Sequence, residues 1–127
     1  HLVLADYCLF DDAILPPLKM AEIMCQTNKK LSELASEIPS YPSDEIVFDC
    51  SDDKKFEFIE KLANKLAKDY KNVSTLDGLR IDFGDAWILL RASNTSPKIR
   101  LYIEAITREK FNELEEKFVG IIKGELE

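Results

Sequence analysis

Side chains that bind anions gather in one short stretch of the chain, RASNTSPKIR, at residues 91 to 100. The candidate ligands are Arg91, Ser93, Asn94, Thr95 and Arg100. A guanidinium group offers paired planar donors that match the oxygen edge of a phosphate, and hydroxyl groups add further donors. Asparagine tolerates the left-handed backbone conformation, in which successive N–H groups converge on an anion. The stretch therefore predicts a loop that binds a phosphate monoester. The alternative is a plain hairpin turn, because Asn, Ser, Thr and Pro are common turn residues.

The segments on both sides of this loop predict the strands that hold it. The segment KIRLYIEA, residues 98 to 105, alternates apolar and polar side chains, as expected of a strand with one buried face. The segment AWILLRAS, residues 86 to 93, comes just before the loop. Arg91 thus ends one strand and Arg100 lies near the start of the next. We expect both guanidinium groups to reach one anion across the turn.

Residues 43 to 127 follow the order strand, helix, four strands, helix. Short turns at Asp77-Gly78 and Gly84-Asp85 imply an antiparallel meander. Each helix has a single apolar stripe, so both should lie on the same face of the sheet. The prediction is an α+β fold with a four- to five-stranded, largely antiparallel sheet and two helices on one face, preceded by a short helical segment.

The two helices of this region have recognisable starts. Ser51 and the two aspartates after it form a start signal, and Thr107 can cap the last helix. The first helix is expected to bury Phe56, Ile59, Ala63, Leu66, Ala67 and Tyr70. Its lysines, between residues 54 and 71, alternate with acids and are interpreted as a solvated face. Trp87 and the phenylalanines are interpreted as core residues.

The first 42 residues predict a separate, mostly helical part. Asp11 or Asp12 can cap a helix whose apolar residues recur from Ile14 onwards. Pro16 and Pro17 fit that helix only in its first turn or at a kink. A second short helix is expected at about residues 30 to 37, and the stretch IPSYPSD, with two prolines, predicts a linker. The boundary is placed near residue 43, which gives parts 1–42 and 43–127.

The composition excludes several classes of function. The formal net charge of -7 repels nucleic acid and anionic membranes, and no apolar run is long enough to span a bilayer. The three cysteines are scattered without a CxxC pair, which favours a reducing, cytoplasmic location. No metal site is predicted in the chain. The aspartates of DCSDD are interpreted as helix caps.

The loop resembles that of a known family, the α-D-phosphohexomutases, whose C-terminal domain carries the motif R-x-S-[NG]-T-x-P. RASNTSP matches this motif, and Arg100 and the Glu104-Ala105 pair follow as in the family. The lead-in DGLRIDFGDAWILLRAS and the upstream FDDAILPPLKMAEI are also similar to family segments. Ala13, in place of a common glycine, and Ser96, in place of a common glutamate, depart from the pattern. His1 would fall at the end of a sugar-reading loop of the family and is not assigned as a site residue.

The resemblance implies that residues 1–42 are the C-terminal remnant of the third domain plus a linker. Residues 43–127 would be the C-terminal, phosphate-binding domain, with a fold similar to that of the TATA-binding protein. It also implies an isomerase that interconverts hexose 1-phosphate and hexose 6-phosphate through a phosphoserine. The implied Mg²⁺ and the hexose bisphosphate intermediate would be handled largely by other domains of the same polypeptide. No catalytic residue is expected in this chain, whose Arg91, Ser93, Asn94, Thr95 and Arg100 would hold the phosphate that is not transferred. The alternative function is a stand-alone α+β module for protein interaction.

Overall fold

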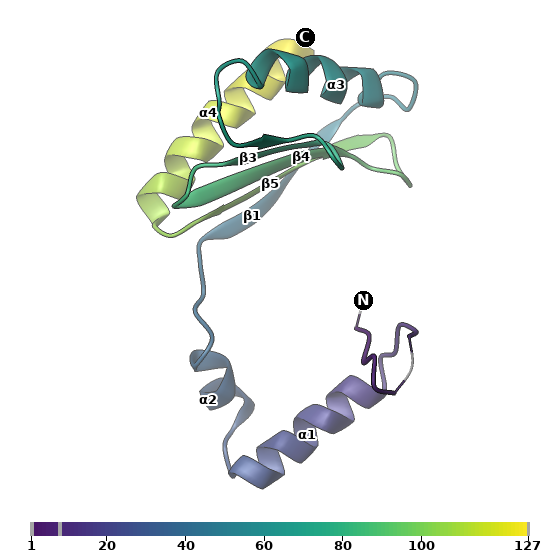
Figure 1. The fold of residues 1–127 in the computed structure, drawn as a ribbon, viewed down its shortest axis with the longest axis vertical. Coiled ribbons are helices and arrows are strands. Elements are labelled where there is room, and N and C mark those ends of the chain that lie inside the picture. Colours follow the sequence, from purple (N-terminus) through teal and green to yellow (C-terminus); the bar gives the residue numbers. More distant parts are fainter. Residues whose placement is uncertain (1, 8, 127) are drawn as a thin grey trace. The chain divides into compact units, whose positions relative to one another are not determined.

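The computed structural model describes residues 2–7 and 9–126, so His1 lies outside the described residues. The chain divides into two compact units, His1–Ser40 and Tyr41–Glu127 (Figure 1). No helix among the described residues is long and apolar enough to cross a membrane.

The first unit consists of two helices, α1 (Leu15–Thr27) and α2 (Leu31–Ser36). The Asp12 carboxylate accepts hydrogen bonds from the backbone N–H groups of Ile14 and Leu15, at 2.7 and 3.3 Å. Both prolines of α1 lie in its first turn, where a missing N–H leaves no hydrogen bond unmade. The helix ends at Asn28, whose φ of 54° is left-handed. The two predicted helices of this unit are therefore confirmed, with α2 slightly shorter than expected.

The second unit is a five-stranded antiparallel sheet with the order β1-β5-β4-β3-β2. Its strands are β1 (Ser43–Asp49), β2 (Val73–Ser74), β3 (Leu79–Asp82), β4 (Ala86–Ala92) and β5 (Lys98–Ala105). Two helices, α3 (Lys55–Leu66) and α4 (Arg108–Leu126), pack on the same face of the sheet (Figure 1). Neither of these two helices covers the other face of the sheet, which is called the open face below. The predicted α+β architecture is confirmed.

The core lies between the sheet and the two helices. The strands contribute alternate residues, so that Ile99, Leu101 and Ile103 of β5 are buried while the residues between them face the open side. The helices bury one stripe each, namely Ile59, Leu62, Ala63 and Leu66 of α3 and Phe111, Leu114, Phe118 and Ile122 of α4. The apolar periodicity of the sequence thus places the core correctly.

Three aromatic residues and one alanine are not where the sequence analysis placed them. Phe10, interpreted as a core residue, is 72% exposed. Phe56, expected in the apolar stripe of α3, is 57% exposed, Ala67 of the same stripe is also exposed, and Leu62 is buried in that stripe instead. Trp87 lies on the open face of β4. There its indole N–H donates to the Glu104 carboxylate at 3.0 Å, and the guanidinium group of Arg80 lies 4.4 Å from its ring centre. The polar N–H and the cation explain why this large ring is stable outside the core.

Thr107 caps α4 as predicted, because its hydroxyl oxygen accepts the Lys110 backbone N–H at 3.2 Å. Replacing Thr107 with alanine should lower the free energy of unfolding of this unit by about 1 kcal/mol, since one N–H of the first turn loses its partner. Urea denaturation monitored by the fluorescence of Trp87, the single tryptophan, measures this change. Thr107→Ser keeps the acceptor and should stay within about 0.5 kcal/mol of the parent. Equal stability of all three proteins would contradict the assignment.

Candidate phosphate-binding site

The five residues predicted to bind an anion line one hollow of about 330 Å³ on the open side of the β4–β5 hairpin. Tyr102 of β5, which the sequence analysis did not select, completes the lining. The hairpin brings these side chains together because β4 and β5 pair with Arg91 directly opposite Arg100. Side chains opposite each other in an antiparallel pair lie on the same face of the sheet.

Each arginine of the hollow is paired with a carboxylate from a neighbouring segment. Arg91 Nη1 lies 3.4 Å from an oxygen of Asp77, which precedes β3, and Arg100 donates to Glu45 of β1. The two carboxylate partners therefore come from opposite sides of the hairpin, because β3 and β1 flank it. Both arginines line the same hollow, and that both reach one anion stays a prediction. Neither carboxylate partner was predicted from the sequence.

These ion pairs differ in how tightly they hold the arginines. The Arg91 pair is long, and the side chain of Asp77 is 72% exposed, so exchange of this carboxylate for a phosphate should cost little. The hydrogen bond from Arg100 to Glu45, together with the charge of that carboxylate, raises the pKa of Arg100. The Tyr102 hydroxyl also donates to Glu45, at 3.1 Å. Arg91 is thus the more available cation of the two.

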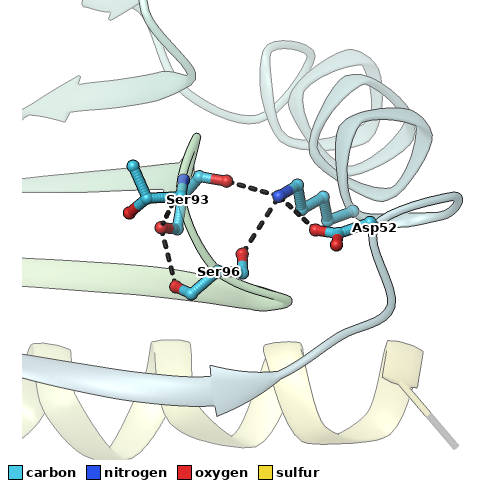
Figure 2. Close-up of polar contacts among 5 residues, drawn as sticks. Asp52, Ser93 and Ser96 are labelled. Atoms are coloured by element: carbon cyan, nitrogen blue, oxygen red, sulfur yellow. Dashed lines mark hydrogen bonds and ion pairs between the residues drawn. The ribbon is translucent and has the colours of Figure 1, made fainter.

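The Ser93 hydroxyl organises the loop from inside. The residue is only 5% exposed, and its Oγ accepts hydrogen bonds from the Ser96 hydroxyl at 2.8 Å and from the Thr95 N–H at 3.4 Å (Figure 2). A serine oxygen accepts up to two hydrogen bonds and still has one proton to donate. Ser93 can therefore brace the turn and offer a single donor to the hollow.

Asn94 does not adopt the left-handed conformation that the sequence analysis expected. Among the described residues, the only positive φ angles belong to Asn28, Gly78 and Gly84. The loop turns instead through ordinary backbone conformations. A short turn closes around Pro97, in which the Lys98 N–H donates to the Ser96 carbonyl at 2.8 Å. The predicted nest geometry at Asn94 is therefore wrong, although the residue does line the hollow.

Lys55, at the start of α3, is a second residue that the sequence analysis missed, and it lies behind the loop. It was interpreted as part of a solvated face, but it is 3% exposed. Its ammonium group donates to the Asp52 carboxylate and to the backbone carbonyls of Ser93 and Ser96, the last at 3.0 Å (Figure 2). A lysine in a run of alternating charges carries no sequence signal of burial, because the two carbonyls that it holds lie about forty residues further along the chain.

Residues 97 and 98, where the hairpin turn leads into β5, are bound to the end of β1 and the residue after it. The Cys50 N–H donates to the Pro97 carbonyl at 3.0 Å, and the Lys98 ammonium lies 2.8 Å from the Asp49 carboxylate. The hydrogen bond from Lys98, followed by its charge, lowers the pKa of Asp49. No three metal-ligating side chains come together in the described part of the chain.

The arginine, hydroxyl and amide groups of this hollow are the kind of donors that match the oxygens of a small anion. Two family models match the chain. One, described as "Phosphoglucomutase/phosphomannomutase, C-terminal domain", matches residues 45–121, and one for "alpha/beta/alpha domain III" of the same family matches residues 1–41. The chain belongs to the phosphoglucomutase/phosphomannomutase family. The resemblance drawn from the loop motif is confirmed.

Individual relatives agree with this assignment. The chain is 35% identical over 118 residues to a probable phosphoglucosamine mutase of Methanopyrus kandleri, an alignment that covers 93% of this chain and 26% of the relative. It is 37% identical over 123 residues to the phosphoglucosamine mutase of Methanocaldococcus jannaschii, covering 96% and 28%. A crystal structure of a phosphoglucomutase/phosphomannomutase family protein from Burkholderia thailandensis matches with a TM-score of 0.76 and 26% identity, covering 94% of this chain and 25% of that one.

The chain spans about a quarter of the length of these relatives. Together with the two domain matches, this indicates that it is part of a multidomain polypeptide. Family membership favours the phosphohexomutase interpretation over a stand-alone interaction module.

Proposed function

We propose that residues 43–127 form the domain that holds the non-transferred phosphate of a hexose phosphate in a phosphohexomutase. The whole protein would interconvert hexose 1-phosphate and hexose 6-phosphate through a phosphoserine located outside this chain. Residues 1–42 would be the end of the preceding domain and its linker. The observation that carries the proposal is the gathering of all five candidate residues around one hollow on the open face.

Each residue of the hollow has a distinct role in this proposal. Arg91 supplies the main positive charge, because its carboxylate partner is exposed and easily exchanged. Ser93 and Thr95 supply hydroxyl and backbone donors, and Asn94 supplies its amide groups. Arg100 supplies a second positive charge, which is paired with Glu45 in the absence of a ligand. Fixing the remote phosphate in this way orients the reacting oxygen at the other end of the sugar, so binding energy is converted into correct positioning.

The remaining chemistry is assigned to other domains. Mg²⁺, which phosphohexomutases generally use, would stabilise charge on the transferred phosphoryl group. The described residues offer no cluster of ligands for it, so we assign none of them to the metal. The hexose bisphosphate intermediate and a cytoplasmic location are also part of the proposal for the whole protein.

A titration of the whole protein tests the proposal directly. Glucose 6-phosphate should shift the backbone amide resonances of residues 93 to 96, and unphosphorylated glucose at the same concentration should leave them unmoved. The phosphate group is the only difference between the two sugars, so the comparison isolates its contribution. Loop amides that respond to neither sugar would sink the proposal.

A further inference from the structure

The burial of Lys55 conflicts with the local preferences of its helix. A positive charge in the first turn of a helix lies at the positive end of the helix dipole, where it is unfavourable. Burying an ammonium group is also costly unless acceptors surround it. Lys55 is nonetheless 3% exposed at the first position of α3. Conflicts of this kind between local preference and structure are most often found at functional sites.

The acceptors of Lys55 show what the charge does. An ammonium group has three protons, and Lys55 donates to three oxygens, of which two are carbonyls of the anion-binding loop. The third belongs to Asp52, whose side chain is 69% exposed. Two of the three contacts of the buried ammonium group are therefore to the backbone of residues 93 and 96, and the third is to a counter-charge.

Holding the Ser93 carbonyl has a geometric consequence for the next residue. In a trans peptide the C=O and the following N–H point in opposite directions, and none of the described peptide bonds is cis. The Ser93 carbonyl points at Lys55, so the Asn94 N–H points away from it. Asn94 lines the hollow, and its N–H donates to no other described residue. At the other end of the loop, the Ser96 carbonyl is fixed by Lys55 and by the Lys98 N–H.

We propose that Lys55 is a positioning residue for the phosphate-binding loop. From the side opposite the hollow, it fixes the peptides that follow Ser93 and Ser96 without touching the ligand. This inference depends on the proposed function, because it names how the same site is held in its binding conformation.

The test compares Lys55→Met with Lys54→Met in the whole protein. Both variants lose one positive charge at neighbouring positions, but Lys54 is exposed and contacts neither loop carbonyl. The affinities for inorganic phosphate and for glucose 6-phosphate are measured by calorimetry, and amide hydrogen exchange is measured over residues 93 to 96. Lys55→Met should weaken both ligands by about tenfold and speed exchange in the loop. Lys54→Met should stay within about twofold of the parent.

Each outcome decides a separate question. If the parent binds phosphate and Lys55→Met binds it as tightly as Lys54→Met, the positioning role is wrong while the proposed function stands. If the parent binds neither phosphate nor glucose 6-phosphate through the loop, the proposed function fails and this inference fails with it. If Lys55→Met lacks a cooperative unfolding transition, Lys55→Gln and Lys54→Gln replace the pair under the same criterion. Parent-like affinity of Lys55→Gln overturns the inference.

Discussion

Replacing Arg91 with alanine in the whole protein should lower kcat/KM for a hexose phosphate by about 30- to 150-fold. A hydrogen bond to a charged group contributes about 2–3 kcal/mol, and each 1.4 kcal/mol is a factor of ten. We expect KM to rise, because Arg91 binds the ground-state phosphate, and kcat to fall, because a loosely held phosphate misplaces the reacting oxygen. Steady-state kinetics with purified protein provides the measurement. The unfolding midpoint should barely change, because Arg91 loses only a long contact to an exposed carboxylate.

Arg80→Ala is the matched control for this prediction. Arg80 lies on the same open face, pairs with Asp82 at 3.7 Å and stacks on Trp87, but it does not line the hollow. The variant removes the same charge from the same side of the sheet and should alter kcat/KM less than about threefold. Kinetics of Arg91→Ala that match those of Arg80→Ala would show that Arg91 contributes only to the general field of the domain.

The sequence was sufficient to predict the fold because the signals of its elements are local. Alternation along β5 and the stripe on α4 depend only on residues a few positions apart, and both match the buried residues of the structure. The same dependence on local signals explains why Phe56 and Trp87 were placed wrongly. The position of an aromatic ring depends on its neighbours across the sheet, such as Glu104 for Trp87, and a single strand does not reveal them.

The sequence predicted which loop residues line the site, but not which residues from other segments contact them. The motif placed Arg91, Ser93 and Thr95 together because they lie in one hairpin. The partners of the two arginines come from the β2–β3 turn and from β1, and the buried Lys55 comes from α3. These contacts join segments far apart in the chain, and each involves a charged residue that looks solvated when its sequence neighbours alone are considered.

The pairing of the cations answers how an acidic domain can hold an anion. Arg91, Arg100 and Lys55 each have one carboxylate partner, namely Asp77, Glu45 and Asp52. A phosphate in the hollow therefore meets two arginines that are already paired, and it must replace a carboxylate to gain a full charge interaction. The ion pair between Arg91 and Asp77 is long and exposed. Exchanging its carboxylate for a phosphate therefore costs the least free energy.

Gly78 is the position where a single methyl group should do the most damage. Its φ of +93° is unfavourable for any residue with a side chain, and a Cβ there would lie 2.2 Å from the Leu90 carbonyl oxygen and 3.0 Å from the Arg91 Cα. Gly78→Ala should lower the free energy of unfolding by about 2–4 kcal/mol, because backbone on β4 must move. Urea denaturation followed by Trp87 fluorescence gives the value.

The other glycines separate the effect of backbone strain from the effect of the steric clash. Gly84 has a φ of +87° but open space around it, so Gly84→Ala should cost only about 1 kcal/mol through strain. Gly120 lies within α4 with open space, and Gly120→Ala should stabilise the unit by about 0.5–1 kcal/mol. If Gly78→Ala is at least as stable as Gly84→Ala, the close approach of Gly78 to β4 is contradicted. Because the displaced backbone carries Arg91, Gly78→Ala should also weaken phosphate binding, and Gly84→Ala should leave it intact.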